Sequence, residues 1–128
     1  MTLKKKIKPT ESELEILQVL WIHGPSSVRQ VNDLLNEQRE VGYTTTLKIM
    51  QIMTEKGLVS RNTENRTHIY HSAVKEGDTQ RSLLDSFIEK TYRGSAMRLV
   101  MQALGNQKAS PEELEKLKAI INELETKS

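Results

Sequence analysis

Apolar residues recur every three or four positions in three stretches of the first half of the chain, which is the spacing of one face of an α-helix. The first stretch begins at Thr10, whose hydroxyl can accept a hydrogen bond from the Glu13 amide while the Glu13 carboxylate returns to the Thr10 amide. It stops at Gly24 and Pro25, residues that commonly end a helix. The sequence therefore predicts a first helix between these signals. Its expected buried face is Leu14, Leu17 and Leu20 or Trp21.

A cap followed by an apolar face also predicts a second and a third helix. Ser27 followed by Gln30 repeats the capping pattern, and a polar connection over residues 36–42 comes after this helix. A third helix is expected over residues 44–56, with Gly57 stopping it. The expected buried residues are Val28, Val31, Leu34 and Leu35 in the second helix and Thr46, Ile49, Met50 and Met53 in the third.

The pattern then changes to the period of a β-sheet. Residues 58–63 and 67–73 are two short runs that contain strand-forming residues, separated by Glu64-Asn65-Arg66. Asn65 suits a left-handed position in that turn, and Tyr70 is expected to pack beneath the hairpin. Three short helices and a hairpin are typical of a winged helix-turn-helix domain. In such a domain the third helix enters the major groove of DNA, and the hairpin, or wing, reaches the adjacent backbone or minor groove.

Helical spacing returns after the hairpin, in three segments separated by Gly94 and by Gly105-Asn106. The last segment opens at Ser110, with Pro111 in the first helical position and Glu113 as the capping partner. These segments carry more apolar surface than so short a tail can bury, so we expect a second copy of the chain to cover it. The alternative is that this surface folds back on the N-terminal core. The residues assigned to the dimer contact are Leu83, Phe87, Leu99, Val100, Leu104, Leu114, Leu117, Ile121 and Leu124.

These patterns predict a mainly α fold with a small β-hairpin, divided into two domains. Residues 1–75 are expected to form a winged helix-turn-helix DNA-binding domain. Residues 76–128 are expected to form a helical dimerisation domain, whose last helix carries a short a/d seam.

The distribution of charge adds a partner to this fold. The net charge is only +2, but residues 1–75 hold eleven Lys and Arg against eight Asp and Glu, and the balance reverses over residues 76–128. No acidic residue lies between Gly42 and Thr54, so the outer face of the third helix can approach phosphates without repulsion. A solvated helix face with no partner is the alternative interpretation.

Candidate DNA-binding residues lie on the third helix and on the hairpin. Thr44 and Thr45 can bind a phosphate at the start of the helix, although Thr44 is better explained as a cap. Lys48 and Gln51 can reach base edges, Lys suiting guanine and Gln suiting adenine. In the wing, Arg66 is the first candidate for a backbone or minor-groove contact, and Arg61 and His68 are weaker phosphate partners. A basic arm of Lys4, Lys5, Lys6 and Lys8 can add nonspecific contacts.

The sequence offers little for an enzyme or a metal protein. Cys is absent, and no Ser-His-Asp grouping, glycine-rich phosphate loop or His-Glu-x-x-His motif occurs. His68 and His71 are expected on opposite faces of one strand, where they cannot share a metal. We therefore expect no cofactor and no metal. Because no stretch is apolar enough for a membrane span or a signal peptide, we expect no membrane insertion and a cytoplasmic protein.

Four motifs, in this order and spacing, resemble the BlaI/MecI family of bacterial repressors, also called the penicillinase repressor family. They are ELEILQVLW (13–21), GPSSV (24–28), GYTTTL (42–47) and EKGLV (55–59). The resemblance extends over most of the chain. It implies a winged-helix DNA-binding domain, a helical dimerisation domain, and repression by a homodimer on a palindromic double-stranded operator.

The resemblance also implies a mode of release. In this family a membrane-bound metalloprotease sensor responds to a β-lactam, and the repressor is cut at an Asn-Phe bond within the dimerisation helices. By position, that bond falls near Met101, Gln102 and Ala103, where neither Asn nor Phe is present. Two other functions fit the same sequence. They are a protein-interaction module built on the winged helix, and a transcriptional regulator that senses a small molecule between tail and wing.

Overall fold

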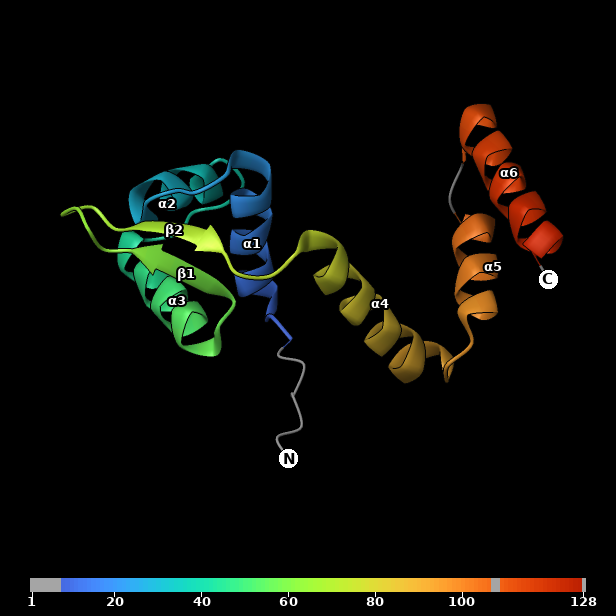
Figure 1. Ribbon diagram of the computed structural model, residues 1–128, viewed down its shortest axis with the longest axis horizontal. Coiled ribbons are helices and arrows are strands. Elements are labelled where there is room, and N and C mark those ends of the chain that lie inside the picture. Colours follow the sequence, from blue (N-terminus) through green and yellow to red (C-terminus); the bar gives the residue numbers. More distant parts are fainter. Residues whose placement is uncertain (1–7, 107–108, 128) are drawn as a thin grey trace. The chain divides into compact units, whose positions relative to one another are not determined.

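A computed structural model of the chain describes residues 8–106 and 109–127, so the expected basic arm at Lys4, Lys5 and Lys6 lies outside the described residues (Figure 1). The elements in order are α1 (Glu11–His23), α2 (Val28–Asn36), α3 (Tyr43–Lys56), β1 (Val59–Asn62), β2 (Ile69–Ser72), α4 (Glu76–Tyr92), α5 (Ala96–Asn106) and α6 (Pro111–Lys127). The residues group into two compact units, one ending at Leu84 and the other beginning at Asp85. The predicted fold class, mainly α with one β-hairpin, is confirmed.

The predicted capping boxes are present at three helix starts. The backbone amides of Thr10 and Ser27 donate to the side chains of Glu13 and Gln30 at 2.8 Å, and each cap hydroxyl accepts the amide three residues later. Ser110 and Glu113 form the same pair at the start of α6. Each box satisfies two backbone amides that would otherwise lack an acceptor at the start of a helix.

The third helix begins differently from the prediction. Its N-cap is Gly42, which offers no side-chain hydrogen bond, and the helix starts at Tyr43. The expectation that Thr44 caps the helix is therefore wrong, because Thr44 already lies inside the first turn. The other end is as predicted, since Gly57 closes α3 in the left-handed conformation with φ 81°.

The hydrophobic core lies among α1, α2, α3 and the hairpin. Thr46, Met50 and Met53 are fully buried, as predicted, and Tyr70 is 1% exposed beneath the hairpin. Three predicted core positions, Leu14, Leu34 and Ile49, are only half-buried. The complete buried apolar set is Ile16, Leu17, Leu20, Val28, Val31, Leu35, Val41, Met50, Met53, Leu58, Val59 and Tyr70. Every member of this core precedes the C-terminal helices.

Trp21 joins the first helix to the base of the hairpin. Its side chain is half-buried and packs against the core, as expected for a structural residue. The indole Nε1 donates to Ser72 Oγ at 3.0 Å and to the Val74 carbonyl oxygen at 3.3 Å. A buried indole usually needs such a partner, so this contact fixes where β2 leaves the winged-helix unit.

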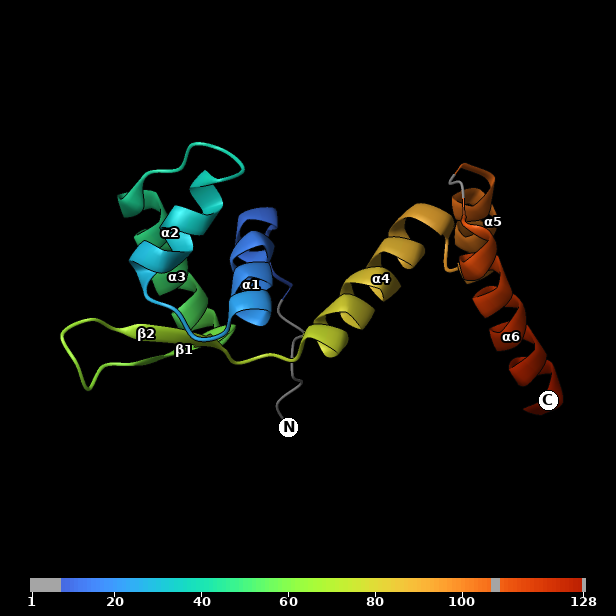
Figure 2. The ribbon, with the colours of Figure 1, turned by 90° about the horizontal axis from the view of Figure 1, so that it is seen from above.

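The hairpin is shorter than predicted. Strands β1 and β2 pair antiparallel with Val59 opposite Ser72 and Asn62 opposite Ile69, which leaves residues 63–68 as a loop. The loop extends beyond the helices of this unit in both views (Figures 1 and 2). The linker before α2 forms a single β-bridge to the free side of β2. In this bridge the Ser26 and Tyr70 backbones exchange hydrogen bonds of 2.9 and 2.8 Å.

Two expectations about the hairpin are wrong. Asn65 is not left-handed, since Arg93 is the one non-glycine residue with positive φ in the described part of the chain. A six-residue loop reverses the chain without such a residue, and its turn chemistry comes from Asn62, whose Oδ1 accepts the Glu64 amide at 2.9 Å. His68 lies in the loop instead of in the strand, so the argument from opposite strand faces does not apply to it.

The second unit has no comparable core. Helices α5 and α6 contain no residue classed as buried among those the structure describes. Gly94 (φ 85°) breaks the chain between α4 and α5 at the predicted place, and Phe87 packs edge-to-face on Tyr92 with ring centroids 5.8 Å apart. Within the described ranges, no helix has the length and apolar character needed to cross a lipid bilayer.

Candidate nucleic-acid interface

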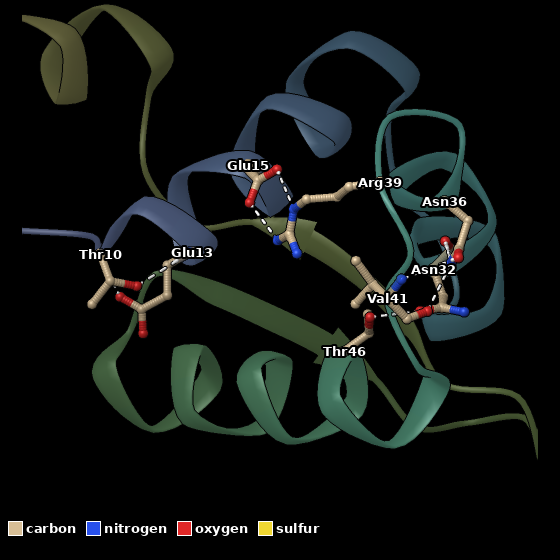
Figure 3. Close-up of polar contacts among 8 residues, drawn as sticks. All are labelled: Thr10, Glu13, Glu15, Asn32, Asn36, Arg39, Val41 and Thr46. Carbon is tan, nitrogen blue, oxygen red and sulfur yellow. Dashed lines mark hydrogen bonds and ion pairs between the residues drawn. The ribbon is translucent and has the colours of Figure 1, made fainter.

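A cluster of polar side chains fixes the turn between α2 and α3 (Figure 3). Asn36 uses both ends of its side-chain amide here. Its Nδ2 donates to the Asn32 and Val41 carbonyl oxygens at 2.7 and 2.8 Å, and its Oδ1 accepts the Val41 amide at 3.1 Å. These bonds close residues 36–41 onto the end of α2. The polar connection predicted from the sequence is thus a rigid turn, which sets the angle at which α3 leaves it.

Asn32 extends this cluster to the buried face of α3. Its amide and Thr46 Oγ1 lie 2.7 Å apart, Asn32 being 9% and Thr46 0% exposed. The same end of the Asn32 side chain faces the carbonyl oxygens of Val41 and Gly42 at 3.2 and 3.3 Å, and because carbonyl oxygens only accept, this end is the amide nitrogen, which also donates to Thr46 Oγ1. A buried amide without hydrogen-bond partners costs free energy. Packing arrangements of α2 and α3 that separate Asn32 from Thr46 are therefore disfavoured.

A second buried polar contact holds the far end of α3. Lys56 Nζ donates to both carboxylate oxygens of Glu13, which is 3% exposed. Burial on its own raises the pKa of Glu13, but the hydrogen bonds from Lys56 and Thr10 and the Lys56 charge together hold that pKa below its ordinary value. The carboxylate is therefore charged at neutral pH and ties the last turn of α3 to the first turn of α1.

An exposed ion pair braces the turn from outside (Figure 3). The Arg39 guanidinium contacts the Glu15 carboxylate with two hydrogen bonds, of 2.6 and 3.2 Å. The bond from Arg39 is the main cause of a pKa of Glu15 below its ordinary value. The charge of Arg39 is thus paired with a carboxylate of its own chain.

Between these anchors, α3 presents the stripe predicted from the sequence. Thr44, Thr45, Lys48 and Gln51 are all exposed, and because Lys48 follows both threonines by one turn and Gln51 follows Lys48 by another, they lie on one side of the helix. Ile52 beside them is 37% exposed, an apolar position on the same surface. No acidic side chain occurs on α3 before Glu55, so the structure presents a carboxylate-free helix surface.

A groove of about 710 Å³ adjoins the start of this stripe. It is lined by side chains from the first turns of α2 and α3 and from the hairpin loop, including Arg29, Tyr43, Arg66 and His68. Two of the predicted wing residues, Arg66 and His68, are thus brought close to the third helix. Arg61 is not among the lining residues, although it is exposed on β1 opposite Tyr70.

Two residues of this groove were not predicted from the sequence. Arg29 lies over the ring of Tyr43, with its Cζ 5.1 Å from the ring centroid. Tyr43 is 42% exposed. The sequence did place Arg29 just after the Ser27 cap and Tyr43 just before the threonines, and charged or aromatic residues at the starts of two paired helices are the signal that could have found them.

The sequence that forms this surface matches a known protein family. Residues 9–123 match the family model described as penicillinase repressor. The chain belongs to the penicillinase repressor family.

Named relatives of this family align along nearly their whole length. The methicillin resistance regulatory protein MecI of Mammaliicoccus sciuri is 25% identical over 118 residues, covering 92% of this chain and 96% of that protein. The penicillinase repressor of Bacillus licheniformis is 26% identical over 121 residues, 94% of each chain. Their names describe a regulatory protein and a repressor, and the predicted resemblance is confirmed.

Solved structures agree on the fold of the first unit. The DNA-binding domain of the repressor BlaI superposes with a TM-score of 0.52 at 24% identity, covering 59% of this chain and 93% of that one. The monomeric form of Bacillus licheniformis BlaI, solved with the blaP half-operator, gives a TM-score of 0.50 over the same shares. The predicted winged helix is confirmed, and this member of the penicillinase repressor family is a DNA-binding transcriptional repressor.

Proposed function

We propose that the chain acts as a homodimer that represses transcription by occupying a palindromic double-stranded operator, with residues 1–75 binding DNA and residues 76–128 forming the dimer. The observation that carries this proposal is the carboxylate-free stripe of α3, held at both ends by buried polar contacts. A surface without like charges on a rigid helix suits the polyanionic major groove. The Bacillus licheniformis relative was solved on a half-operator, which supports the same partner here.

Each predicted contact has a role in this proposal. Thr44 and Thr45 occupy the first turn of α3, where Gly42 leaves the backbone amides without a side-chain acceptor, so a phosphate oxygen can take them. Lys48 and Gln51, further along the same side, read base edges. Arg66 reaches the neighbouring backbone from the hairpin loop, with His68 beside it. Arg61, outside the groove, contributes charge at longer range.

The partner that we propose for α4, α5 and α6 is a second copy of the chain. These helices expose large apolar side chains at helical spacing while burying almost nothing among themselves, and such surface is unfavourable in water. Among the proposed contact residues, Phe87, Val100, Leu104, Leu114, Ile121 and Leu124 are 42–63% exposed, and Leu83, Leu99 and Leu117 are half-buried. A dimer covers this surface and places two α3 helices about 34 Å apart, one helical turn of DNA.

The DNA-binding part is tested by equilibrium binding to a random-sequence duplex and to duplexes selected from a random pool. We expect the logarithm of the binding constant to fall linearly with the logarithm of salt concentration, by about 0.9 for each phosphate neutralised. A protein-interaction module built on the same fold would show no salt-sensitive affinity for DNA. The selected sites should also be palindromic, and asymmetric single sites would contradict the proposed arrangement.

The dimer is tested by sedimentation equilibrium of matched variants in α6. Ile121→Lys places a charge on the proposed seam, whereas Asn122→Lys adds the same charge at the neighbouring position, off the seam. We expect the first variant to be monomeric at concentrations where the wild type and the second variant are dimeric. Equal association of all three proteins would show that this seam is not the interface.

We also propose that a cut in the exposed segment Met101, Gln102 and Ala103 releases the operator. A break there, in the middle of α5, separates the α6 seam from the DNA-binding unit and so removes the gain of binding two half-sites together. We expect the metalloprotease sensor of the family to make this cut in the cytoplasm. The bond that it cleaves would be one other than Asn-Phe. A chain truncated after Gln102 should bind single half-sites unchanged but lose its preference for palindromic sites, and retention of that preference would contradict this step.

A further inference from the structure

Two exposed arginines of the winged-helix unit are held in different ways. Arg39 forms two hydrogen bonds with the Glu15 carboxylate, so its charge is neutralised within the chain. Arg29 instead lies 5.1 Å above the ring of Tyr43, and no carboxylate of the described residues forms an ion pair with it. The two residues thus have the same charge and are both exposed, but only Arg39 is paired with a carboxylate.

The contact with Tyr43 orders Arg29 without consuming its hydrogen-bonding capacity. A guanidinium over an aromatic face is attracted by the ring, while its planar N–H groups remain directed outward. Fixing a long side chain beforehand lowers the entropy that its binding partner must otherwise overcome. Arg29 is therefore prepared for an acceptor such as a phosphate, which Arg guanidinium groups bind with paired hydrogen bonds.

The position of Arg29 points to the same acceptor. It shares the groove with Arg66 and His68 of the hairpin loop, and Tyr43 begins the helix that carries Thr44 and Lys48. Asp33 is the one acidic side chain among the lining residues, one turn further along α2. The lining thus holds two arginines against one carboxylate, and this net positive charge favours an anion in the groove.

We propose that Arg29 is a DNA phosphate contact, that Tyr43 is its positioning residue, and that the pair extends the DNA-binding surface from α3 across the groove to the wing. This inference rests on the proposed function, because it assumes that α3 and the hairpin face the same duplex. It adds to that function a contact from α2, made through side chains that the stripe on α3 does not contain.

The first experiment compares Arg29→Gln with Arg39→Gln, two substitutions that each remove one exposed positive charge. Binding of each full-length variant to a random-sequence duplex is measured as a function of salt concentration. For Arg29→Gln we expect the steepness of the salt dependence to fall by about 0.9 and the affinity for all sequences to fall together, as for one lost phosphate contact. Arg39→Gln should keep the wild-type steepness. Arg29→Lys, which keeps the charge, should keep it as well.

The second experiment tests the positioning role with a double-mutant cycle. Tyr43→Leu keeps the Arg29 charge but removes the ring, so we expect weaker DNA binding with an unchanged salt dependence. In an Arg29→Gln background the same substitution should have no further effect on affinity, because the residue that it positions is already gone. If Tyr43→Leu weakens binding equally in both backgrounds, Tyr43 does not act through Arg29.

The outcomes separate this inference from the proposed function. If wild-type protein binds DNA with a clear salt dependence and Arg29→Gln and Arg39→Gln behave alike, the assignment of Arg29 is wrong and the repressor proposal stands. If the wild type itself shows no salt-sensitive affinity, the proposed DNA-facing surface fails and Arg29 fails with it. Circular dichroism of each variant checks that the helices are retained, and a folded Arg29→Gln protein with a reduced salt dependence supports the contact.

Discussion

Lys56 Nζ, in the last turn of α3, lies 2.9 and 3.0 Å from the two carboxylate oxygens of Glu13, in the first turn of α1. The same carboxylate accepts the Thr10 amide, so one buried side chain both caps α1 and anchors α3. The sequence showed only the capping half of this arrangement. The other half joins residues 43 positions apart and fixes the end of α3, the helix that we propose binds DNA.

Replacing Glu13 with Gln should make stability less dependent on acid pH. Because the pKa of Glu13 is lower in the folded chain than its ordinary value of 4.5, the charged carboxylate stabilises the fold above that pH. The contribution is lost as pH falls through the folded-state pKa. Gln can still accept the Thr10 amide through its one oxygen, but it loses the charge and one of the two acceptors of Lys56 Nζ. We expect a loss on the order of 2 kcal/mol at neutral pH, from urea unfolding, shrinking toward zero in acid.

Glu15→Gln is the matched control for that substitution. The Glu15–Arg39 pair also lowers a carboxyl pKa, but both side chains are largely exposed, 39% and 48%. Water already solvates such charges, so their pairing contributes little. We expect the pH dependence of unfolding to change far less than in Glu13→Gln. Equal changes in the two variants would show that burial of Glu13 does not strengthen its contact with Lys56.

Thr46→Val should destabilise the chain although the two side chains have nearly the same shape. The substitution removes the hydroxyl that pairs with the Asn32 amide in a fully buried position, leaving a polar group without that partner. We expect a loss of about 1 to 3 kcal/mol in urea unfolding. Thr46→Ser, which keeps the hydroxyl and loses only a methyl group, should be the milder variant. The opposite order would mean that packing, and not the hydrogen bond, makes Thr46 important.

How much of this could be predicted depended on the range of the interactions involved. Capping boxes and apolar spacing act within a few residues, so Thr10, Ser27 and Ser110 were located correctly and α1 to α6 followed. The contacts of Asn32 with Thr46 and of Glu13 with Lys56 join residues far apart in the chain. No local sequence pattern predicts such contacts. The prediction of a left-handed Asn65 was wrong because the conformation of a turn depends on loop length. The strands ended earlier than their composition indicated, so the loop was longer than expected.

The candidate site divided along the same line. The stripe of Thr44, Thr45, Lys48 and Gln51 depends on the period of one helix, so its members could be found together. The contact between Arg29 and Tyr43 exists only because α2 and α3 cross near their first turns. A pair of this kind requires the tertiary fold to be known, which explains why it was missed.

Lys48→Ala should weaken binding selectively. If Lys48 reads a base edge, its loss should cost on the order of 1 to 3 kcal/mol at one position of each half-site and relax the preference there. Affinity for random duplex should fall much less. Competition binding with a set of single-base variants of the selected site measures this directly. A variant that binds operator and random DNA as the wild type does would place the reading surface elsewhere.

Arg66→Ala should act in the opposite way, because a backbone contact carries no sequence information of its own. We expect affinity for every duplex to fall by a similar factor and the salt dependence to lose about 0.9 in steepness, with base preferences unchanged. The hairpin loop extends beyond the helices (Figure 2). The DNA phosphate that Arg66 contacts should therefore lie outside the bases read by α3. Shortening the duplex from its ends should therefore abolish the difference between Arg66→Ala and wild type before it affects Lys48→Ala. Should both differences disappear at the same duplex length, the wing does not reach beyond the half-site that α3 contacts.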